Sequence, residues 1–475
     1  MGIPPKMRYS LSLLFQLKCS PTQAGIPHGQ KNSRSGCRLR QHGQIARPRL
    51  HNIKEFDICG LVARGESKVA LNKELGGKYQ LFDDYDAALA TAKPDAVCIS
   101  TYPDTHEEYA LKAFKAGAHV FLEKPVAPTV AGCERVVAAA KKANKKLVVG
   151  YILRHHPSWT RFVSEAQKLG KPLVMRMNLN QQSKGAMWTT HKNLMNSMSP
   201  IVDCGVHYVD MMCLMTQSRP VSVSAIGARL SDEIGKDMYN YGQLQVRFED
   251  GSVGWYEAGW GPMASTKAFF VKDVWGPKGS VTITAQNASD ESQSDNVDAH
   301  TKTEQIRVHH AAQDKNNEFI KKDDWISTGD EPDHNGLCER EQRYFLDAIV
   351  KDVDLSKHME DAINSLKIVL AADESFRKGK TIDFAKSGKK AAKKAEKAIK
   401  AEKKAAKAAK ADKPAKKTEK VDKKDAKPVT KTAAKKAKVA TKVVAEKKAV
   451  KTAVQAGKKV AKADVKTAGK PKKKA

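Results

Sequence analysis

Residues 118–125 have the sequence Ala118-His119-Val120-Phe121-Leu122-Glu123-Lys124-Pro125, in which an apolar run ends abruptly in a charged pair and a proline. A short apolar run bounded by turn residues is typical of a buried strand. Helical patterns flank this run, in residues 104–116 before it and 130–143 after it. Short apolar strands that alternate with helices predict βαβ units and a parallel sheet.

The same alternation extends in both directions along the chain. Further apolar strands are expected at residues 56–62, 95–100 and 146–150, and a further helix at 68–75. We therefore expect a Rossmann-type dinucleotide-binding domain over residues 37–150, preceded by an irregular basic segment over residues 1–36.

The pattern changes after Tyr151, where the expected strands become longer and alternate between apolar and polar residues. Asp250-Gly251 separates two such strands within residues 243–260, which is a strong hairpin signal. Other strands and two closing helices complete the pattern at residues 173–180, 221–230, 269–274, 280–284, 339–351 and 359–378. The fold class is thus α/β, with a second α+β domain over residues 151–385 built on an open, mostly antiparallel sheet.

The net charge of +31 is concentrated at the two ends of the chain. Residues 386–475 contain 34 lysines and 8 acidic residues, whereas residues 1–52 contain 9 basic and no acidic residues. The folded middle is therefore close to neutral. The Lys/Ala-rich tail has too little apolar surface to offset its ordering entropy, so we expect it to be disordered. It serves either to bind nucleic acid or other polyanions without sequence preference or simply to keep the chain in solution.

The 8 cysteines include no Cys-x-x-Cys pair, which argues against a structural zinc site and a disulfide framework. We expect no metal and a reducing, cytoplasmic location. No apolar run reaches the length of a membrane span. The run at residues 11–17 weakly imitates a signal peptide, but Lys18 interrupts it before any cleavage site.

Three groups of residues have the character of a reaction site. Glu123 and Lys124 directly follow a parallel strand, and ligands of open parallel sheets bind beyond the carboxyl ends of the strands. A lysine there can exchange a proton with a substrate oxygen. The competing interpretation is a surface Glu-Lys pair.

The second group lies on one apolar helix expected at residues 201–215. Asp203, His207 and Asp210 are spaced four and three residues apart, so they form one polar stripe along this helix. Buried polar groups need partners, and a shared polar pocket would supply them. The alternative is that Asp203 caps the helix and His207 is structural.

The third group follows the expected strand at residues 95–100. Thr101 and His106 stand at its carboxyl end, Pro103 suits the first turn of the next helix, and Asp104 suits its cap. Direct contact with a ligand and a purely structural role both remain open for these residues.

Together these groups resemble the glucose–fructose oxidoreductase/inositol dehydrogenase (Gfo/Idh/MocA) family. The resemblance covers residues 41–385 and rests on ordered motifs, namely Tyr102-Pro103-Asp104-Thr105-His106, Ala116-Gly117-Ala118 through Val126-Ala127, Val149-Gly150-Tyr151 through His156-Pro157, Asp203-Cys204-Gly205-Val206-His207-Tyr208-Val209-Asp210 and Gly276-Pro277-Lys278-Gly279-Ser280. It implies hydride transfer between NAD or NADP and a sugar, polyol or cyclitol, and a homo-oligomer.

The resemblance also implies roles for individual residues. It implies that Lys124 is the acid/base residue and that Asp203 and His207 complete the catalytic cluster. The positions that it places at the cofactor are Gly36, Arg64, Thr101, Pro103, His106, Glu123, Lys124 and Arg154. The positions that it places at the substrate are Trp188, His191 and Lys192.

The family pattern breaks at its start. The next glycine after Gly36 is Gly43, so the Gly-x-Gly-x-x-Gly turn that admits a pyrophosphate is missing. Either residues 1–38 replace the true first strand, or ordinary cofactor binding has been lost. Farther on, Ala63 stands where an acid would hold a ribose hydroxyl, and Arg64 follows it, which favours NADP.

Three functions remain open from the sequence. The leading one is an NAD(P)-dependent sugar or polyol oxidoreductase. The second is a catalytically silent binding module tethered to nucleic acid by the tail, and the third is a redox-neutral hydrolase or epimerase with tightly held cofactor. Binding and net turnover of free cofactor distinguish them.

Overall fold

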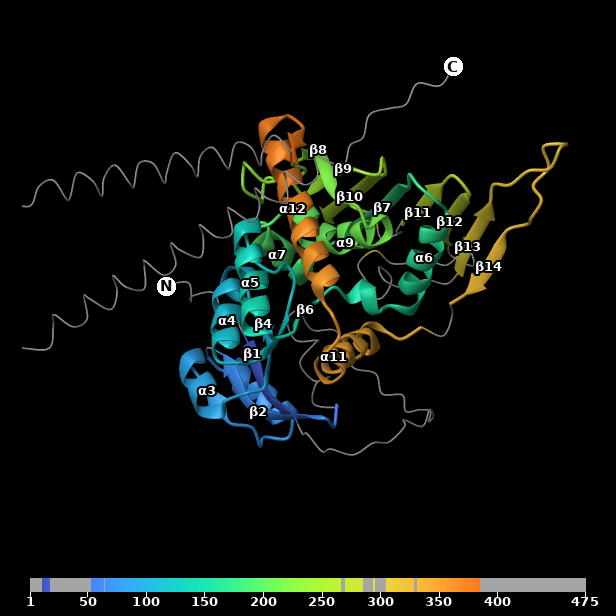
Figure 1. The fold of residues 1–475 in the computed structure, drawn as a ribbon. Coiled ribbons are helices and arrows are strands. Elements are labelled where there is room, and N and C mark those ends of the chain that lie inside the picture. Colours follow the sequence, from blue (N-terminus) through green and yellow to red (C-terminus); the bar gives the residue numbers. More distant parts are fainter. Residues whose placement is uncertain are drawn as a thin grey trace, which may run out of the picture. The chain divides into compact units, whose positions relative to one another are not determined.

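The computed structural model describes residues 11–17, 53–63, 65–265, 270–284, 294, 305–328 and 331–384, all within one compact unit of the chain (Figure 1). Gly36, Arg64 and the tail at residues 386–475 lie outside these ranges. Two sheets organise the described residues, and each corresponds to one of the two expected domains.

The first sheet has six strands in the order β3-β2-β1-β4-β5-β6. This is the strand order of the Rossmann fold. β2 pairs with β3, β4 with β5 and β5 with β6, all in parallel, as the alternation of strands and helices predicts. The strands are β1 (Leu11–Leu17), β2 (Phe56–Ala63), β3 (Leu81–Phe82), β4 (Ala96–Ser100), β5 (His119–Leu122) and β6 (Leu147–Val149).

The central strand β1 runs in the opposite direction to all the others. Its first residue, Leu11, pairs with both Ala63 and Ser100, the last residues of β2 and β4. Its last residue, Leu17, pairs with Phe56, the first residue of β2. The carboxyl end of β1 therefore lies at the edge of the sheet where β2 and β4 begin. The sequence did not predict this strand, because its short apolar run stands far from any other element of the sheet.

Helices connect the parallel strands and cover the sheet. Each begins or ends on a recognisable signal, as in α3, where the Asp84 carboxylate accepts from Ala87 N at 2.7 Å, and α4, which starts at Pro103. α4 and α5 pack against each other beside the sheet (Figure 1). The helices are α2 (Ser67–Glu74), α3 (Tyr85–Ala92), α4 (Pro103–Lys115) and α5 (Val130–Ala143).

The second sheet has nine strands in the order β14-β13-β12-β11-β7-β10-β9-β8-β15. Asp250 and Gly251 lie in the turn between β9 and β10, so the predicted hairpin is confirmed. Only β7 and β10 pair in parallel among these strands. The strands are β7 (Val174–Gln182), β8 (Pro220–Ala228), β9 (Tyr241–Phe248), β10 (Val253–Gly261), β11 (Lys272–Gly276), β12 (Gly279–Thr284), β13 (Gln305–His310), β14 (Asp324–Ser327) and β15 (Ile382–Asp383).

Helices of the second domain fill the space between the two sheets. The long helix α12 packs against α9 and β8 of the second domain and against α5 of the first (Figure 1). The helices are α6 (Pro157–Lys168), α7 (Gly185–Leu194), α8 (Pro200–Asp203), α9 (Gly205–Thr216), α11 (His334–Val350) and α12 (Ser356–Lys378), with the 3₁₀ turn η1 at Ile152–His155. None of the described helices combines the length and apolar character that crossing a bilayer requires.

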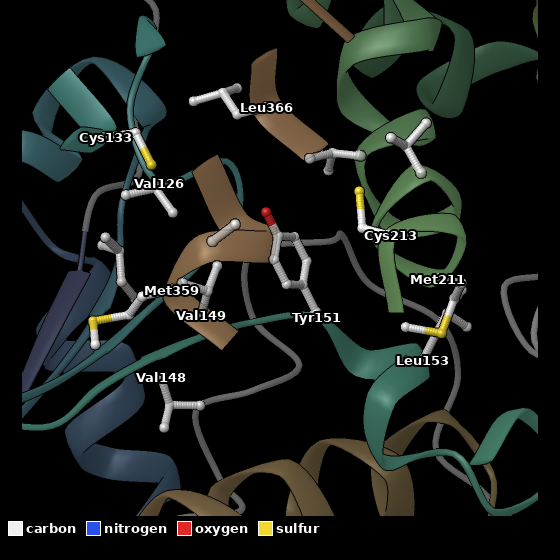
Figure 2. Close-up of a cluster of buried hydrophobic side chains, with 14 of the residues drawn as sticks. Val126, Cys133, Val148, Val149, Tyr151, Leu153, Met211, Cys213, Met359 and Leu366 are labelled. Carbon is white, nitrogen blue, oxygen red and sulfur yellow. The ribbon is translucent and has the colours of Figure 1, made fainter. Parts of the chain in front are cut away.

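The two domains meet at the fully buried Tyr151, which follows β6. Its hydroxyl lies 3.0 Å from Ser365 Oγ on α12. Figure 2 shows apolar side chains from both domains around this ring, including Val149 from β6, Cys213 from α9 and Met359 from α12. Because the junction is apolar and closely packed, the carboxyl edge of the first sheet is held against α8 and α9.

Candidate active site

Lys124 lies in the loop that leaves β5 at the carboxyl edge of the first sheet. The backbone N–H of Glu123 donates to Ile99 O at 2.9 Å, so the loop continues the pairing of β5 with β4. Nδ1 of the buried His106 lies 2.7 Å from Pro125 O, and Nε2 lies 3.0 Å from Thr101 O. The His106 ring thus ties the loop after β5 to the loop after β4.

The side chain of Lys124 reaches the second domain. Its ammonium donates to Asp203 Oδ1 at 2.8 Å and to the Asp203 carbonyl at 3.0 Å. Both side chains are about one-fifth exposed, at 20% and 17%. Burial opposes the charged amine, but the Asp203 carboxylate outweighs it and raises the pKa of Lys124. Lys124 therefore carries a proton at neutral pH.

His207 lies one helical turn after Asp203, at the start of α9. Burial, together with the charge of Lys124, lowers the pKa of the His207 imidazole to about 3. Its buried Nδ1 has no hydrogen-bond partner among the described residues. The structure therefore brings a charged proton donor and a neutral imidazole into one cluster.

The single helix expected at residues 201–215 is divided into α8 and α9 at Cys204. Asp210, the third member of the expected polar stripe, points to a different partner. It accepts from Arg154 Nε at 2.6 Å and from Nη2 at 2.8 Å, and Arg154 Nη2 also donates to Asp361 Oδ2 at 2.8 Å. Both carboxylates are fully buried. Arg154 thus joins η1, α9 and α12 as a clamp.

The residues expected after β4 differ in their contacts. Pro103 begins α4, and the Thr101 hydroxyl lies 2.6 Å from that of Thr105 on the same helix. Thr101 is half-buried at the carboxyl edge of the sheet, near the Lys124 loop. His106 is completely buried and both of its nitrogens face carbonyl oxygens, so its ring has no nitrogen left for a ligand.

The expected substrate residues lie on α7, beside the Asp203 helix. His191 stacks on Trp260 with the ring centroids 4.2 Å apart, and Trp188 and Trp260 belong to one apolar cluster against which Cys204 packs. The Trp188 Nε1 donates to Glu233 Oε1 at 2.9 Å, and Lys192 pairs with the other oxygen of Glu233. Trp188 and Lys192 therefore both bind Glu233, whereas His191 stacks on Trp260.

One wall of the site was not foreseen from the sequence. Helix α11 packs on the face of the first sheet, where Phe345 contacts Phe121 of β5 at a centroid distance of 6.0 Å. One turn earlier, the buried Glu341 lies close enough to Glu123 for the Glu123 charge to add to the effect of burial in raising the pKa of Glu341. The first residue of the helix, His334, lies near enough to His207 to affect its pKa. No local signal links α11 to the site, because the contact spans more than 200 residues.

The carboxyl edge of the first sheet suits the nicotinamide end of a dinucleotide. Thr101, Glu123 and Lys124 place a hydroxyl, a carboxylate and an ammonium there. The buried Nδ1 of His207 has no hydrogen-bond partner among the described residues, which is unusual for a buried polar atom. The described residues do not offer comparable contacts to the phosphates of the dinucleotide. With β1 reversed, its carboxyl end lies at the opposite edge, and the described residues include no phosphate-binding turn beside the carboxyl ends of β2 and β4.

Comparison with known protein families gives two adjacent matches. Residues 40–151 match the oxidoreductase family with an NAD-binding Rossmann fold, and residues 161–282 match the GFO/IDH/MocA C-terminal domain. The matched ranges coincide with the two sheets, apart from β1 and the segments after β12.

Curated relatives point in the same direction. The inositol 2-dehydrogenase of Klebsiella pneumoniae subsp. pneumoniae is 32% identical over 168 residues, which cover 33% of this chain and 48% of the relative. That of Paracoccus denitrificans is 32% identical over 145 residues, covering 30% of this chain and 41% of the relative. The chain thus spans about half the length of the curated relatives it matches.

Solved structures share the fold over a longer range. The scyllo-inositol dehydrogenase of Lactobacillus casei, solved with NAD(H) and scyllo-inositol, aligns with a TM-score of 0.57 at 19% identity over 73% of this chain and 97% of its own. The aldose-aldose oxidoreductase of Caulobacter crescentus aligns with a TM-score of 0.56 at 20% identity, over 72% and 96%. At such low identity these alignments establish the fold alone.

Proposed function

Since the chain belongs to the Gfo/Idh/MocA oxidoreductase family, we propose that it transfers a hydride between NAD or NADP and the carbinol carbon of a sugar, polyol or cyclitol. The observation that carries the proposal is the contact of Lys124 with Asp203, beside His207. Three side chains from two domains converge there on one partly exposed point. The names of the inositol dehydrogenase relatives support cyclitols as the first substrates to test.

The cluster supplies the proton chemistry of the reaction. When bound, the dinucleotide supplies the hydride acceptor or donor. Oxidation of an alcohol also releases the hydroxyl proton, and the protein must accept it. Lys124 is protonated, so its ammonium donates a hydrogen bond to the substrate oxygen and stabilises negative charge developing on it. In oxidation Lys124 releases its own proton to solvent and then accepts the hydroxyl proton, and in the reverse direction the same ammonium gives its proton to the carbonyl oxygen.

His207 and Asp203 complete the cluster. The neutral His207 imidazole acts only as a hydrogen-bonding partner of the substrate, because a pKa of about 3 makes it too weak a base to take the hydroxyl proton. Asp203 holds the Lys124 amine through two oxygens, which fixes its position and maintains its charge. Thr101, Glu123 and, through His106, the adjoining loops position the nicotinamide end of the cofactor.

A preference for NADP is part of the proposal. Ala63, the last residue of β2, provides no carboxylate for the ribose hydroxyls. The buried Lys68 ammonium lies 3.0 Å from Ala63 O but is neutralised by its ion pair with Asp83, so the positive charge in this proposal is that of Arg64, which follows Ala63 in the sequence. A positive charge favours a 2′-phosphate, so we expect a lower KM for NADP than for NAD. A clear preference for NAD would contradict this part alone.

The test is cofactor-linked turnover of inositols and aldoses by the full chain. We expect Lys124→Met to lower kcat/KM by about 10²–10⁴-fold, the usual contribution of a positioned proton donor. Lys112→Met is the matched control, because Lys112 lies on the surface of α4 and forms an ion pair with Asp86 of α3. Equal activity of the two variants would refute the role of Lys124, and absence of turnover in the parent chain would refute the enzyme.

We propose in addition that the chain self-associates through the open face of the second sheet. Trp275 and Trp325 are about half exposed, and the Arg176 guanidinium lies 4.7 Å from the centre of the Trp275 ring. Sedimentation should give a dimer or tetramer that Trp275→Glu weakens. A monomeric parent chain would contradict the proposal.

The lysine tail is proposed to act separately from the catalytic cluster. It should bind polyanions through counterion release, with a steep dependence on salt. Removal of residues 386–475 should abolish binding to heparin or DNA and leave turnover unchanged. Loss of turnover on truncation would show that the tail and the cluster are not independent.

A further inference from the structure

The buried carboxylate of Glu341 is the feature of the described structure that the proposed reaction leaves unused. Glu341 lies on α11, beyond the residues matched by either family comparison, and its side chain is 3% exposed. Its Oε1 has no hydrogen-bond partner among the described residues. An isolated buried carboxylate is costly, so such a group takes up a proton or finds a charged partner.

The packing of α11 on β5 determines what Glu341 meets. Phe345 contacts Phe121, and Phe121 and Glu123 project on the same face of the extended chain because they are two residues apart. Glu341 precedes Phe345 by one helical turn and therefore lies on the same stripe of α11. The helix and the strand thus bring Phe345 onto Phe121 and Glu341 onto Glu123.

Glu123 is confined on its other sides. A methyl group added at Gly150 would lie only 2.9 Å from Glu123 Oε2, so the carboxylate is packed directly against the start of the domain junction. Burial raises the pKa of Glu123, but the charge of the neighbouring Lys124 opposes this rise. Glu341 has no such cation, and the Glu123 charge raises its pKa further. Of two buried carboxyl groups that interact in this way, the one without a cation keeps its proton.

We propose that Glu341 is a positioning residue of the catalytic centre: it stays uncharged, donates a hydrogen bond to the Glu123 carboxylate and thereby holds the loop that carries Lys124. The expected effect of Glu341 on turnover rests on the proposed function, whereas the protonation of Glu341 does not. Burial, followed by the charge of Glu123, keeps the pKa of Glu341 well above its ordinary value. Glu123 itself remains beside the ammonium of Lys124.

The first experiment measures stability and does not depend on activity. A carboxyl group whose pKa is raised by folding stabilises the folded state only below its unfolded pKa, and the contribution is lost as the pH rises. Because glutamine does not titrate, the Glu341→Gln variant does not lose this stability as the pH rises. Its Tm should equal that of the parent chain near pH 4 and exceed it by a few degrees near pH 8. Parallel Tm curves for the two proteins would overturn the proposal.

The second experiment tests positioning through rescue by a conservative substitution. Glutamine can still donate a hydrogen bond to Glu123, whereas leucine cannot. We expect kcat of Glu341→Gln to stay within about threefold of the parent value and kcat of Glu341→Leu to fall more than tenfold, with a smaller change in KM. Equal losses in both variants would overturn the hydrogen bond to Glu123.

Controls separate the possible failures. Glu339→Gln, on the same helix, removes a carboxylate that pairs with Arg343 at the surface, and it should give neither the pH-dependent gain in Tm nor the loss in kcat. If Glu341→Leu does not fold, the Tm curve of Glu341→Gln still decides the question. If the parent chain turns over no substrate, the proposed function fails, and the same Tm curve tests the protonation of Glu341 on its own.

Discussion

Lys124 Nζ and Asp203 Oδ1 are 2.8 Å apart, although the two residues are separated by 79 positions and belong to different domains. The contact crosses between the two domains, which also meet at Tyr151, whose hydroxyl lies 3.0 Å from Ser365 Oγ. The catalytic cluster is therefore a property of the assembled pair of domains, and neither sheet contains it alone.

Asp203→Asn should shift the pH dependence of carbonyl reduction. Burial lowers the pKa of Lys124 and the Asp203 charge raises it, so loss of that charge leaves the burial effect unopposed. The amine then loses its proton at a lower pH. We expect the alkaline limb of the kcat/KM profile to move down by about one pH unit or more, with a fall in kcat. An unchanged limb would mean that Lys124 does not donate the proton.

Lys124→Gln should raise the pKa of His207. Burial is the largest cause of its low value of about 3, and the Lys124 charge is the second. Removing the charge therefore raises the pKa while leaving the imidazole mostly neutral at pH 7. The shift is measurable by NMR titration of the histidine ring protons. A pKa that stays constant in the variant would place His207 outside the range of Lys124.

Arg154→Met should destabilise the folded chain strongly. It would leave the carboxylate of Asp210 buried without a counter-charge and Asp361 with Lys357 alone, and breaking a buried ion pair in this way usually costs about 3–5 kcal/mol. Arg135→Met is the control, because its ion pair with Glu107 is exposed and should contribute at most about 1 kcal/mol. Urea unfolding compares the two variants. Weakened cofactor binding with normal stability in Arg154→Met would instead make Arg154 a ligand contact.

The reversed strand β1 predicts an unusual dependence on the size of the cofactor. A dinucleotide normally gains affinity when its pyrophosphate meets a glycine turn and a helix N-terminus. The described residues include no such turn, so for a dinucleotide without a 2′-phosphate they offer contacts at the nicotinamide end only. We expect the dissociation constants of the reduced dinucleotide and of the reduced nicotinamide mononucleotide to agree within about tenfold. Dinucleotide binding that is a thousandfold tighter would require a phosphate site elsewhere in the chain.

The sequence predicted those parts of the fold that repeat a local pattern. β2, β4, β5 and β6 were all expected, and so was the hairpin at Asp250-Gly251, because each combines an apolar run with a turn signal. Lys124, Asp203 and His207 were singled out by their positions after a strand and along a helix. The structure places these three side chains together.

Features that depend on long-range packing could not be predicted in this way. Nothing local distinguishes Asp210 from Asp203, yet one binds Arg154 and the other Lys124. In the sequence Glu341 is an ordinary helical glutamate, and only the packing of α11 on β5 distinguishes it. A single sequence reports which faces are apolar, but it does not report which buried carboxylate meets which cation.

The position of β1 has a consequence for how the first sheet holds together. β1 pairs with β2 along one side and with β4 along the other. The edges of β2 and β4 that face the middle of the sheet are therefore closed by main-chain hydrogen bonds to one seven-residue strand, and without β1 the sheet would divide into β3-β2 and β4-β5-β6.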